Sequence, residues 1–232
     1  MNYEEIITKL KSLSDPIAVI GMARYGINPK NNLGISIYKL RNIAKEIGKD
    51  HDLALKLWGS GIHDARLLAC FVDKPNLVTE KQMDLWASAF DSWDICDQAC
   101  TSLFDLSPFS WKKVFEWAKS NEEFVKRGAF SLIAGLSVHD KESKDEMFEK
   151  FSPLILKHSV DERNYVKKAV NWALRNIGKR NIVLNKKMIK LAEEIYTIES
   201  KSARWIASDA LRELKSEKIQ TRLKKNNKKG NK

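Results

Sequence analysis

Apolar residues recur every three or four positions along most of the chain, which is the period of an amphipathic helix. No segment shows the strict alternation of apolar and polar residues that predicts a half-buried strand. We therefore predict roughly a dozen helices of about 10 to 17 residues with short connections. The clearest apolar stripe lies along one helix, at Val166, Ala169, Val170, Ala173, Leu174 and Ile177.

Residues that commonly begin helices support this prediction. Side chains of Ser, Thr, Asn and Asp accept hydrogen bonds from the unpaired N–H groups of a first helical turn. Thr79 with Gln82 has the spacing of a capping box, and Ser107 stands before a proline that suits the first helical position. Four further candidate caps precede periodic runs: Ser36, Asn121, Asp161 and Ser202.

Three segments of similar sequence follow one another in the second half of the chain. They are "VKRGAFSLIAGL" from Val125, "VKKAVNWALRNI" from Val166 and "ARWIASDALREL" from Ala203, at spacings of 41 and 37 residues. Helix pairs that repeat about every 40 residues are typical of HEAT and armadillo proteins. We predict an all-α solenoid of such repeats over residues 1–214, and "ARLLACFVD" from Ala65 reads as an earlier copy.

The chain has 41 Lys and Arg against 30 Asp and Glu, a net charge of +11. Residues 215–232 hold eight basic residues and one acid, which predicts a disordered tail that either binds polyanions nonspecifically or keeps the protein soluble. Other basic residues fall opposite the apolar stripes, where they either are simply solvated or join into one concave basic face. These residues are Lys168, Arg175, Lys179 and Arg204.

Several classes of protein are disfavoured by the sequence. No run approaches the roughly 18 apolar residues of a membrane span, and the first residues lack the order of a signal peptide. Three cysteines, an odd number, favour a reduced, cytoplasmic protein. The four histidines are far apart and no phosphate-binding loop occurs, so we expect neither a metal nor a cofactor. The segment "GIHDAR" at residues 61–66 is interpreted as polar packing at a helix start.

The stretch "DSWDICDQAC" at residues 91–100 is the strongest candidate for chemistry. Asp91 suits an N-cap and Asp94 the third helical position, where its charge faces the positive end of the helix dipole. Asp97 lies beyond the first turn, at the rim of an apolar stripe and one turn from Trp93. Burial of a carboxylate is costly. Asp97 therefore either takes part in a reaction or forms a salt bridge to a neighbouring repeat.

The pair Trp93 and Asp97, the arginine in "VKRGAF" (Arg127) and the tryptophan in "VNWALR" (Trp172) occur in a fixed order. This ordered set resembles the AlkD-like DNA alkylation repair glycosylases, which are HEAT-like repeat proteins. The resemblance covers roughly residues 15–215 and includes Tyr25 in "ARY". Two departures are Ser92, where the family can carry a second tryptophan, and a divergent loop at residues 26–34.

The resemblance implies a monofunctional, monomeric glycosylase that removes N3- or N7-alkylated purines from duplex DNA. By this resemblance, Asp97 would stabilise the cationic sugar, and Trp93 and Trp172 would contact the cation. Arg127 would bind a flanking phosphate. A noncatalytic HEAT-repeat module that binds nucleic acid or protein is the alternative, and the basic tail favours a third, RNA-associated role. The residues expected to bind DNA are Tyr25, Lys168, Arg175, Lys179 and Arg204.

Overall fold

The computed structural model describes residues 1–230, and their side chains as far as residue 226. Over this range the secondary structure is helical, with no strand, which confirms the all-α prediction. The chain divides into two compact units, Met1–Ser110 (unit 1) and Trp111 onward (unit 2), where the sequence predicts one domain over residues 1–214. Each unit has its own buried apolar core.

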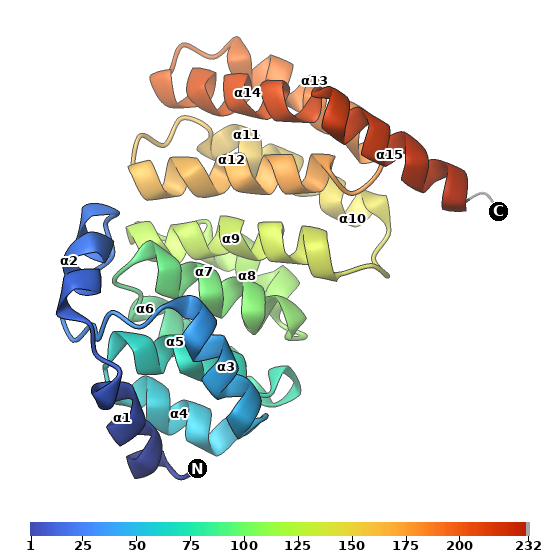
Figure 1. Ribbon diagram of the computed structural model, residues 1–232. Coiled ribbons are helices and arrows are strands. Elements are labelled where there is room, and N and C mark those ends of the chain that lie inside the picture. The colour runs from blue at the N-terminus through green and yellow to red at the C-terminus, as the bar shows by residue number, and fades with distance from the viewer. Residues whose placement is uncertain (231–232) are drawn as a thin grey trace. The chain divides into compact units, whose positions relative to one another are not determined.

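Unit 1 contains seven α-helices and two short 3₁₀ helices among the described residues (Figure 1). Their bounds are α1 Tyr3–Ser12, α2 Pro16–Arg24, α3 Ile37–Ile47, α4 His51–Gly59, α5 His63–Val72, η1 Pro75–Leu77, α6 Glu80–Ser88, α7 Trp93–Ser102 and η2 Phe104–Leu106.

Helix α5 is the centre of unit 1, and it packs against α3, α4 and α7. All but one of its ten residues are buried. Beside it the rings of Trp58 and Trp86 stack with centroids 4.0 Å apart, and the guanidinium of Arg66 lies over Trp58 at 4.5 Å. A buried cation is thus covered by an aromatic face, which compensates part of its lost hydration.

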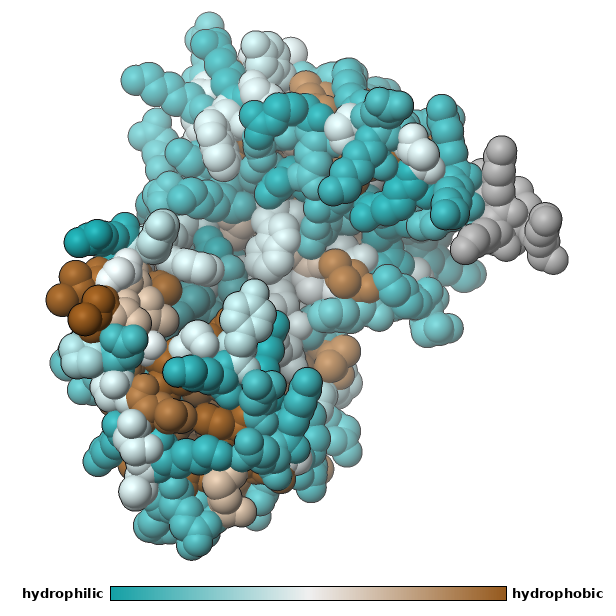
Figure 2. Space-filling view, viewed as in Figure 1, coloured by the Kyte–Doolittle hydropathy of each residue, from teal (hydrophilic) through white to brown (hydrophobic). Residues whose placement is uncertain are grey.

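Helix α2 is held by the connection that follows it. Gly34 has φ +76°, and a Cβ there would lie 2.4 Å from the carbonyl oxygen of Asp15. Only glycine allows the backbone to approach α2 so closely in this conformation. Ile17 and Ile20 of α2 are 82% and 61% exposed, and Figure 2 shows hydrophobic atoms gathered over this helix.

Unit 2 is built from the remaining helices among the described residues (Figure 1). Their bounds are α8 Ser110–Trp117, α9 Glu123–His139, α10 Asp145–Glu149, α11 Ser152–His158, α12 Asn164–Gly178, α13 Ile182–Tyr196, α14 Lys201–Leu214 and α15 Glu217–Gly230.

The three similar segments of the sequence lie in α9, α12 and α14. Helix α12 packs against both of the others, and the three lie side by side in Figure 1, with α11 and α13 behind them. Close packing in this layer depends on Gly178, where a Cβ would lie 2.8 Å from the side chain of Leu214. Segments about 40 residues apart in the sequence therefore form neighbouring helices of one layer, as the prediction of stacked repeats requires.

Two of the predicted caps are confirmed directly. Ser36 and Thr79 accept hydrogen bonds from the N–H groups of Lys39 and Gln82. Asn121, Asp161 and Ser202 are not caps, because the helices near them begin after Glu122, Arg163 and Ser200. Ser107 likewise lies three residues before α8 begins at Ser110.

The predicted disordered tail is wrong for the residues that the structure describes. Helix α15 begins at Glu217 and packs against α13 and α14. Ile219 and Leu223 are 6% and 1% exposed, and they lie one turn apart on the same side of the helix. Two apolar residues among many lysines are a weak sequence signal for a packed helix. They are enough to hold α15 because α13 and α14 already provide the surface on which it packs. Residues 231–232 lie outside the described range.

Candidate functional site

Helix α7 carries the stretch that the sequence analysis singled out, and it begins differently from the prediction. Its N-cap is Ser92 and its first residue is Trp93, so Asp91 is not the cap. The carboxylate of Asp91 instead accepts hydrogen bonds from Asn28 Nδ2 and Arg66 Nη1, both at 3.1 Å. Asp91 therefore connects the 26–34 loop to α5.

Asp94 is the second residue of α7, and its carboxylate forms specific hydrogen bonds in addition to lying near the positive end of the helix dipole. Its side chain is almost buried, with Oδ2 2.9 Å from His63 Nε2 and Oδ1 accepting a 2.6 Å hydrogen bond from Ser92. Burial alone would raise the pKa of the carboxyl group, but the interactions with His63 and Ser92 outweigh it, and the pKa is lowered. Breaking a buried pair by removing one charge is much more destabilising than losing the small dipole effect that the sequence predicts.

The "GIHDAR" segment forms the start of α5 and connects it to several loops. Asp64 accepts hydrogen bonds from the N–H groups of Leu33 and Ile35 at 2.6 and 2.9 Å, and burial raises its pKa. Arg66 also donates to the carbonyl of Ala89. The interpretation as polar packing fits these contacts. Through Asp64, His63 and Arg66, the segment fixes both the 26–35 connection and the turn that leads into α7.

Trp93 and Asp97 lie one turn apart on α7. Asp97 is only 8% exposed, whereas Trp93 is half-buried. The indole Nε1 of Trp93 donates a 3.0 Å hydrogen bond to the backbone carbonyl of Tyr25, which ends α2. Unit 1 thus brings together three of the predicted site residues, and the ring of Tyr25 stays 77% exposed.

Other groups on α7 are unsuited to chemistry. Ser92 is fully buried and its hydroxyl is used by Asp94, so this position provides no second stacking surface. Cys96 and Cys100 are fully buried, and neither forms a disulfide. Burial raises the pKa of Cys100 well above its ordinary value, and the charge of Asp97 adds to this effect. Such a thiol is a poor nucleophile.

Unit 2 holds the other two residues of the ordered set. Arg127, on α9, is 6% exposed, and its Nη1 donates a 2.7 Å hydrogen bond to the carbonyl of Tyr165 on α12. Trp172 lies on α12 and is half-buried. Arg127 therefore contributes to the contact between two adjacent repeats, in addition to any role toward a ligand.

The four basic residues expected to bind DNA fall into two classes. Arg175 and Lys179 face α14, where both form ion pairs with Glu213, the latter at 2.9 Å. Burial would raise the pKa of Glu213, but these two cations outweigh it and lower the pKa. Lys168 and Arg204 are exposed and have no ion pair among the described residues. Of the four predicted DNA-binding cations, Lys168 and Arg204 are thus the ones whose charge is not already paired within the described residues.

Over the described range, no group of three or more His, Cys, Asp and Glu side chains is placed to hold a metal ion. None of the helices in that range has the length and apolar character required to cross a membrane.

Comparison with known proteins decides the family. Residues 6–214 match the family model of the DNA alkylation repair enzymes, which is most of the chain. The chain belongs to this family. The match includes every candidate site residue and ends before α15, so the DNA alkylation repair family model describes the stacked helices without the C-terminal one.

Two relatives from Listeria resemble the chain only distantly. An uncharacterised protein of Listeria monocytogenes is 22% identical over 138 residues, which are 58% of this chain and 62% of that protein. An uncharacterised protein of Listeria innocua is 21% identical over 217 residues, 86% of this chain and 96% of that protein. The chain thus spans less than two thirds of the first relative and nearly all of the second.

One solved structure has a similar fold. It is described as a member of a new family of proteins related to the HEAT-like repeat DNA glycosylases, with affinity for branched DNA structures. The two chains superpose with a TM-score of 0.77 at 18% identity, over 91% of this chain and 95% of that one. The predicted HEAT-like class of fold is therefore confirmed.

Proposed function

We propose that the protein hydrolyses the N-glycosidic bond of N3- or N7-alkylated purines in duplex DNA. The observation that carries this proposal is the pair on α7. A carboxylate that is 8% exposed lies one helical turn from a half-buried indole, in a chain that belongs to the DNA alkylation repair enzymes. A nearly buried carboxylate beside an aromatic face is an arrangement that can stabilise a cation.

The reaction needs little acid catalysis, because an alkylated purine already carries a positive charge. The bond between C1′ and the base nitrogen breaks, its electron pair leaves with the base, and the sugar develops oxocarbenium character. Water adds to C1′ and gives up a proton to solvent. Asp97 would stabilise the cationic sugar electrostatically and orient the attacking water, a type of contact that typically contributes a factor of about 10²–10³ in rate.

The remaining site residues are assigned to binding. The indoles of Trp93 and Trp172 would contact the cationic nucleotide, at about 0.5–2 kcal/mol each. Arg127 would bind a flanking phosphate, and Lys168, Arg204 and the exposed ring of Tyr25 would contact the DNA backbone. Arg175 and Lys179 are proposed as weaker contacts, because Glu213 already pairs with both.

The direct test uses a duplex that contains one N7-methylguanine. Incubation with the protein should release the free base and leave an abasic site that breaks on heating in alkali. Asp97→Asn should abolish most of the release. The matched control is Asp52→Asn, which removes an exposed carboxylate from α4 and should leave release unchanged. If neither the native protein nor the control released any base, the proposed reaction would be rejected.

A second candidate function is binding of branched DNA without base excision. It is favoured by the solved relative with the similar fold, which is described as having affinity for such structures. The discriminating measurement is the affinity for a four-way junction relative to a linear duplex of the same length. Preferential junction binding together with no base release would support this function over the first.

A further inference from the structure

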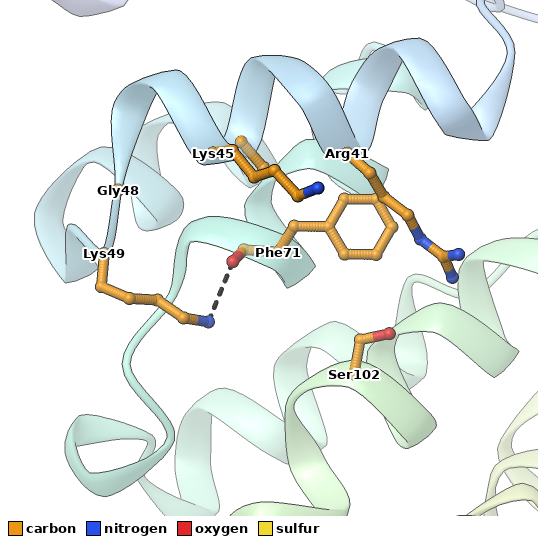
Figure 3. A pocket seen from close by; sticks show the side chains of 7 residues that line it. Arg41, Lys45, Gly48, Lys49, Phe71 and Ser102 are labelled. Atoms are coloured by element: carbon orange, nitrogen blue, oxygen red, sulfur yellow. Dashed lines mark hydrogen bonds between the residues drawn. The ribbon is translucent and has the colours of Figure 1, made fainter.

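A pocket of about 380 Å³ opens on unit 1 between the side chains of α3, α5 and the end of α7 (Figure 3). Its volume falls within the roughly 300–1,000 Å³ of sites for small molecules. None of its lining residues belongs to the proposed excision machinery. The residues that matter are Arg41, Ala44, Lys45, Lys49, Phe71 and Ser102.

The pocket carries cationic side chains that are available to a ligand. Arg41 and Lys45 are exposed and lie one turn apart on α3, and neither forms an ion pair with a carboxylate among the described residues. Arg41 has only a long 3.4 Å hydrogen bond, to Gln98 Oε1. The pocket therefore attracts an anion.

Lys49 has a different task at the edge of the pocket. Its Nζ donates to the carbonyl oxygens of Phe71 and Asp73 at 2.9 and 2.8 Å. Two of the three donors of this ammonium group are thereby used to fix the end of α5. The position of the Phe71 backbone is thus determined before any ligand arrives.

The pocket also presents an aromatic ring. Phe71 is half-buried, and in Figure 3 its ring lies between the ends of Arg41 and Lys45, with Ser102 across from it. The guanidinium carbon of Arg41 is 5.5 Å from the ring centroid, within the range of a cation–π contact. Ala44 adds an apolar side chain to the lining. Cations around a ring and an apolar side chain suit a flat aromatic ligand that bears a negative charge.

We infer that this pocket binds an unstacked nucleobase of single-stranded DNA, with the base on Phe71 and its phosphates at Arg41 and Lys45. An aromatic platform flanked by cations is the arrangement by which proteins bind single strands without reading their sequence. This inference rests on the proposed binding of DNA but not on base excision. It predicts that a duplex with an unpaired strand binds better than a fully paired one.

The test compares two DNA ligands that share one duplex, of which one carries a single-stranded flap of thymidines. Fluorescence anisotropy should show tighter binding of the flap ligand by the native protein. Phe71→Leu keeps an apolar side chain and should weaken flap binding about tenfold, the typical effect of one stacked base, without changing duplex binding. Phe71→Tyr retains the ring and should retain the preference.

A charge variant and a matched control complete the experiment. Arg41→Gln with Lys45→Gln should reduce the slope of log affinity against log salt for the flap by about 1.4, since each phosphate contact on a single strand contributes about 0.7. Lys39→Gln removes one exposed positive charge from the same helix outside the pocket and should leave the flap preference intact. A flap of abasic sites should bind native protein as weakly as the thymidine flap binds Phe71→Leu.

Distinct results would overturn the inference. Equal affinity of the native protein for the flap and paired ligands would do so, as would equal effects of Phe71→Leu and Lys39→Gln. Binding of free thymidine monophosphate that depends on Phe71, without a flap preference, would assign the pocket to a free nucleotide instead of a strand. No binding of either DNA would refute the proposed function, whereas duplex binding without a flap advantage refutes this inference alone.

Discussion

The buried pair of His63 and Asp94 should be a main support of helix α7, and Asp94→Asn tests this. The substitution keeps the size and shape of the side chain and removes its charge. His63 is 2% exposed and Asp94 9% exposed, so water cannot replace the lost interaction. Two side chains form hydrogen bonds with the carboxylate, Ser92 at 2.6 Å and the His63 ring at 2.9 Å, and the backbone N–H of Ile95 adds a third.

Hydrogen bonds to a charged group contribute about 1.5–3 kcal/mol each when one partner is changed. Asn still offers one oxygen to Ser92, so we expect a net loss of about 2–3 kcal/mol in the free energy of unfolding at pH 7. For a chain of this length that corresponds to a decrease in Tm of about 4–12 °C. The exposed control Asp52→Asn should stay within about 0.5 kcal/mol. Thermal and urea unfolding, followed by circular dichroism, measure both.

The effect of pH gives a second arm of the same test. The pKa of Asp94 is lowered in the folded protein from its ordinary value near 3.8. Its stabilising contribution is therefore fully present above that value and is lost as pH falls through the folded-state pKa. The difference between native protein and Asp94→Asn should shrink as the pH falls below about 4. A loss no larger than that of Asp52→Asn, or a difference that does not shrink in acid, would refute the reasoning.

Three further predictions concern the C-terminal helix, the basic residues and Ser92. Leu223→Ala should lower the free energy of unfolding by about 2–5 kcal/mol, because its side chain is fully buried, whereas a disordered tail would show no change in urea unfolding. Lys168→Glu with Arg204→Glu should weaken duplex binding and lower the slope of log affinity against log salt by about 1.8. Arg175→Gln should change this slope by much less, because Glu213 already pairs with Arg175. Equal slopes for all variants would contradict the distinction between paired and unpaired cations. Ser92→Trp should destabilise the fold by more than about 1 kcal/mol in thermal unfolding, because this buried position has no space for an indole. An unchanged Tm would show that the position does have space for a second tryptophan.

The sequence predicts the repeated helices well because their signal is local. The apolar stripe from Val166 to Ile177 is buried at each of its six positions, as its spacing requires. Ser36 and Thr79 cap their helices because capping depends on only three or four adjacent residues. Helix α15 is the counterexample, since Ile219 and Leu223 are significant only once α13 and α14 provide a surface.

The sequence predicts on which helices the candidate residues lie, but not what surrounds them. The spacing of Trp93 and Asp97 correctly places them on one helix. Nothing in the spacing of Asp94 reveals His63, which is 31 residues away, and nothing in that of Arg175 reveals Glu213, 38 residues away. These partners are brought together by packing between helices. The sequence therefore predicts an unpaired Arg175 and an Asp94 that only faces the helix dipole, whereas both side chains are paired in the structure. The roles of Arg127, Trp172 and Asp97 in a reaction stay predictions.

The measurement that most directly tests the central claim is the single-turnover rate of N7-methylguanine release from duplex DNA by native protein, Asp97→Asn and Asp52→Asn. Each rate is read beside the Tm and the duplex affinity of the same variant. We predict release by the native protein, a rate about 10²–10³-fold lower for Asp97→Asn at an unchanged Tm and affinity, and a native rate for Asp52→Asn. Equal rates for the two variants, or a loss of Tm in Asp97→Asn large enough to explain its inactivity, would contradict the assignment of Asp97 to the reaction.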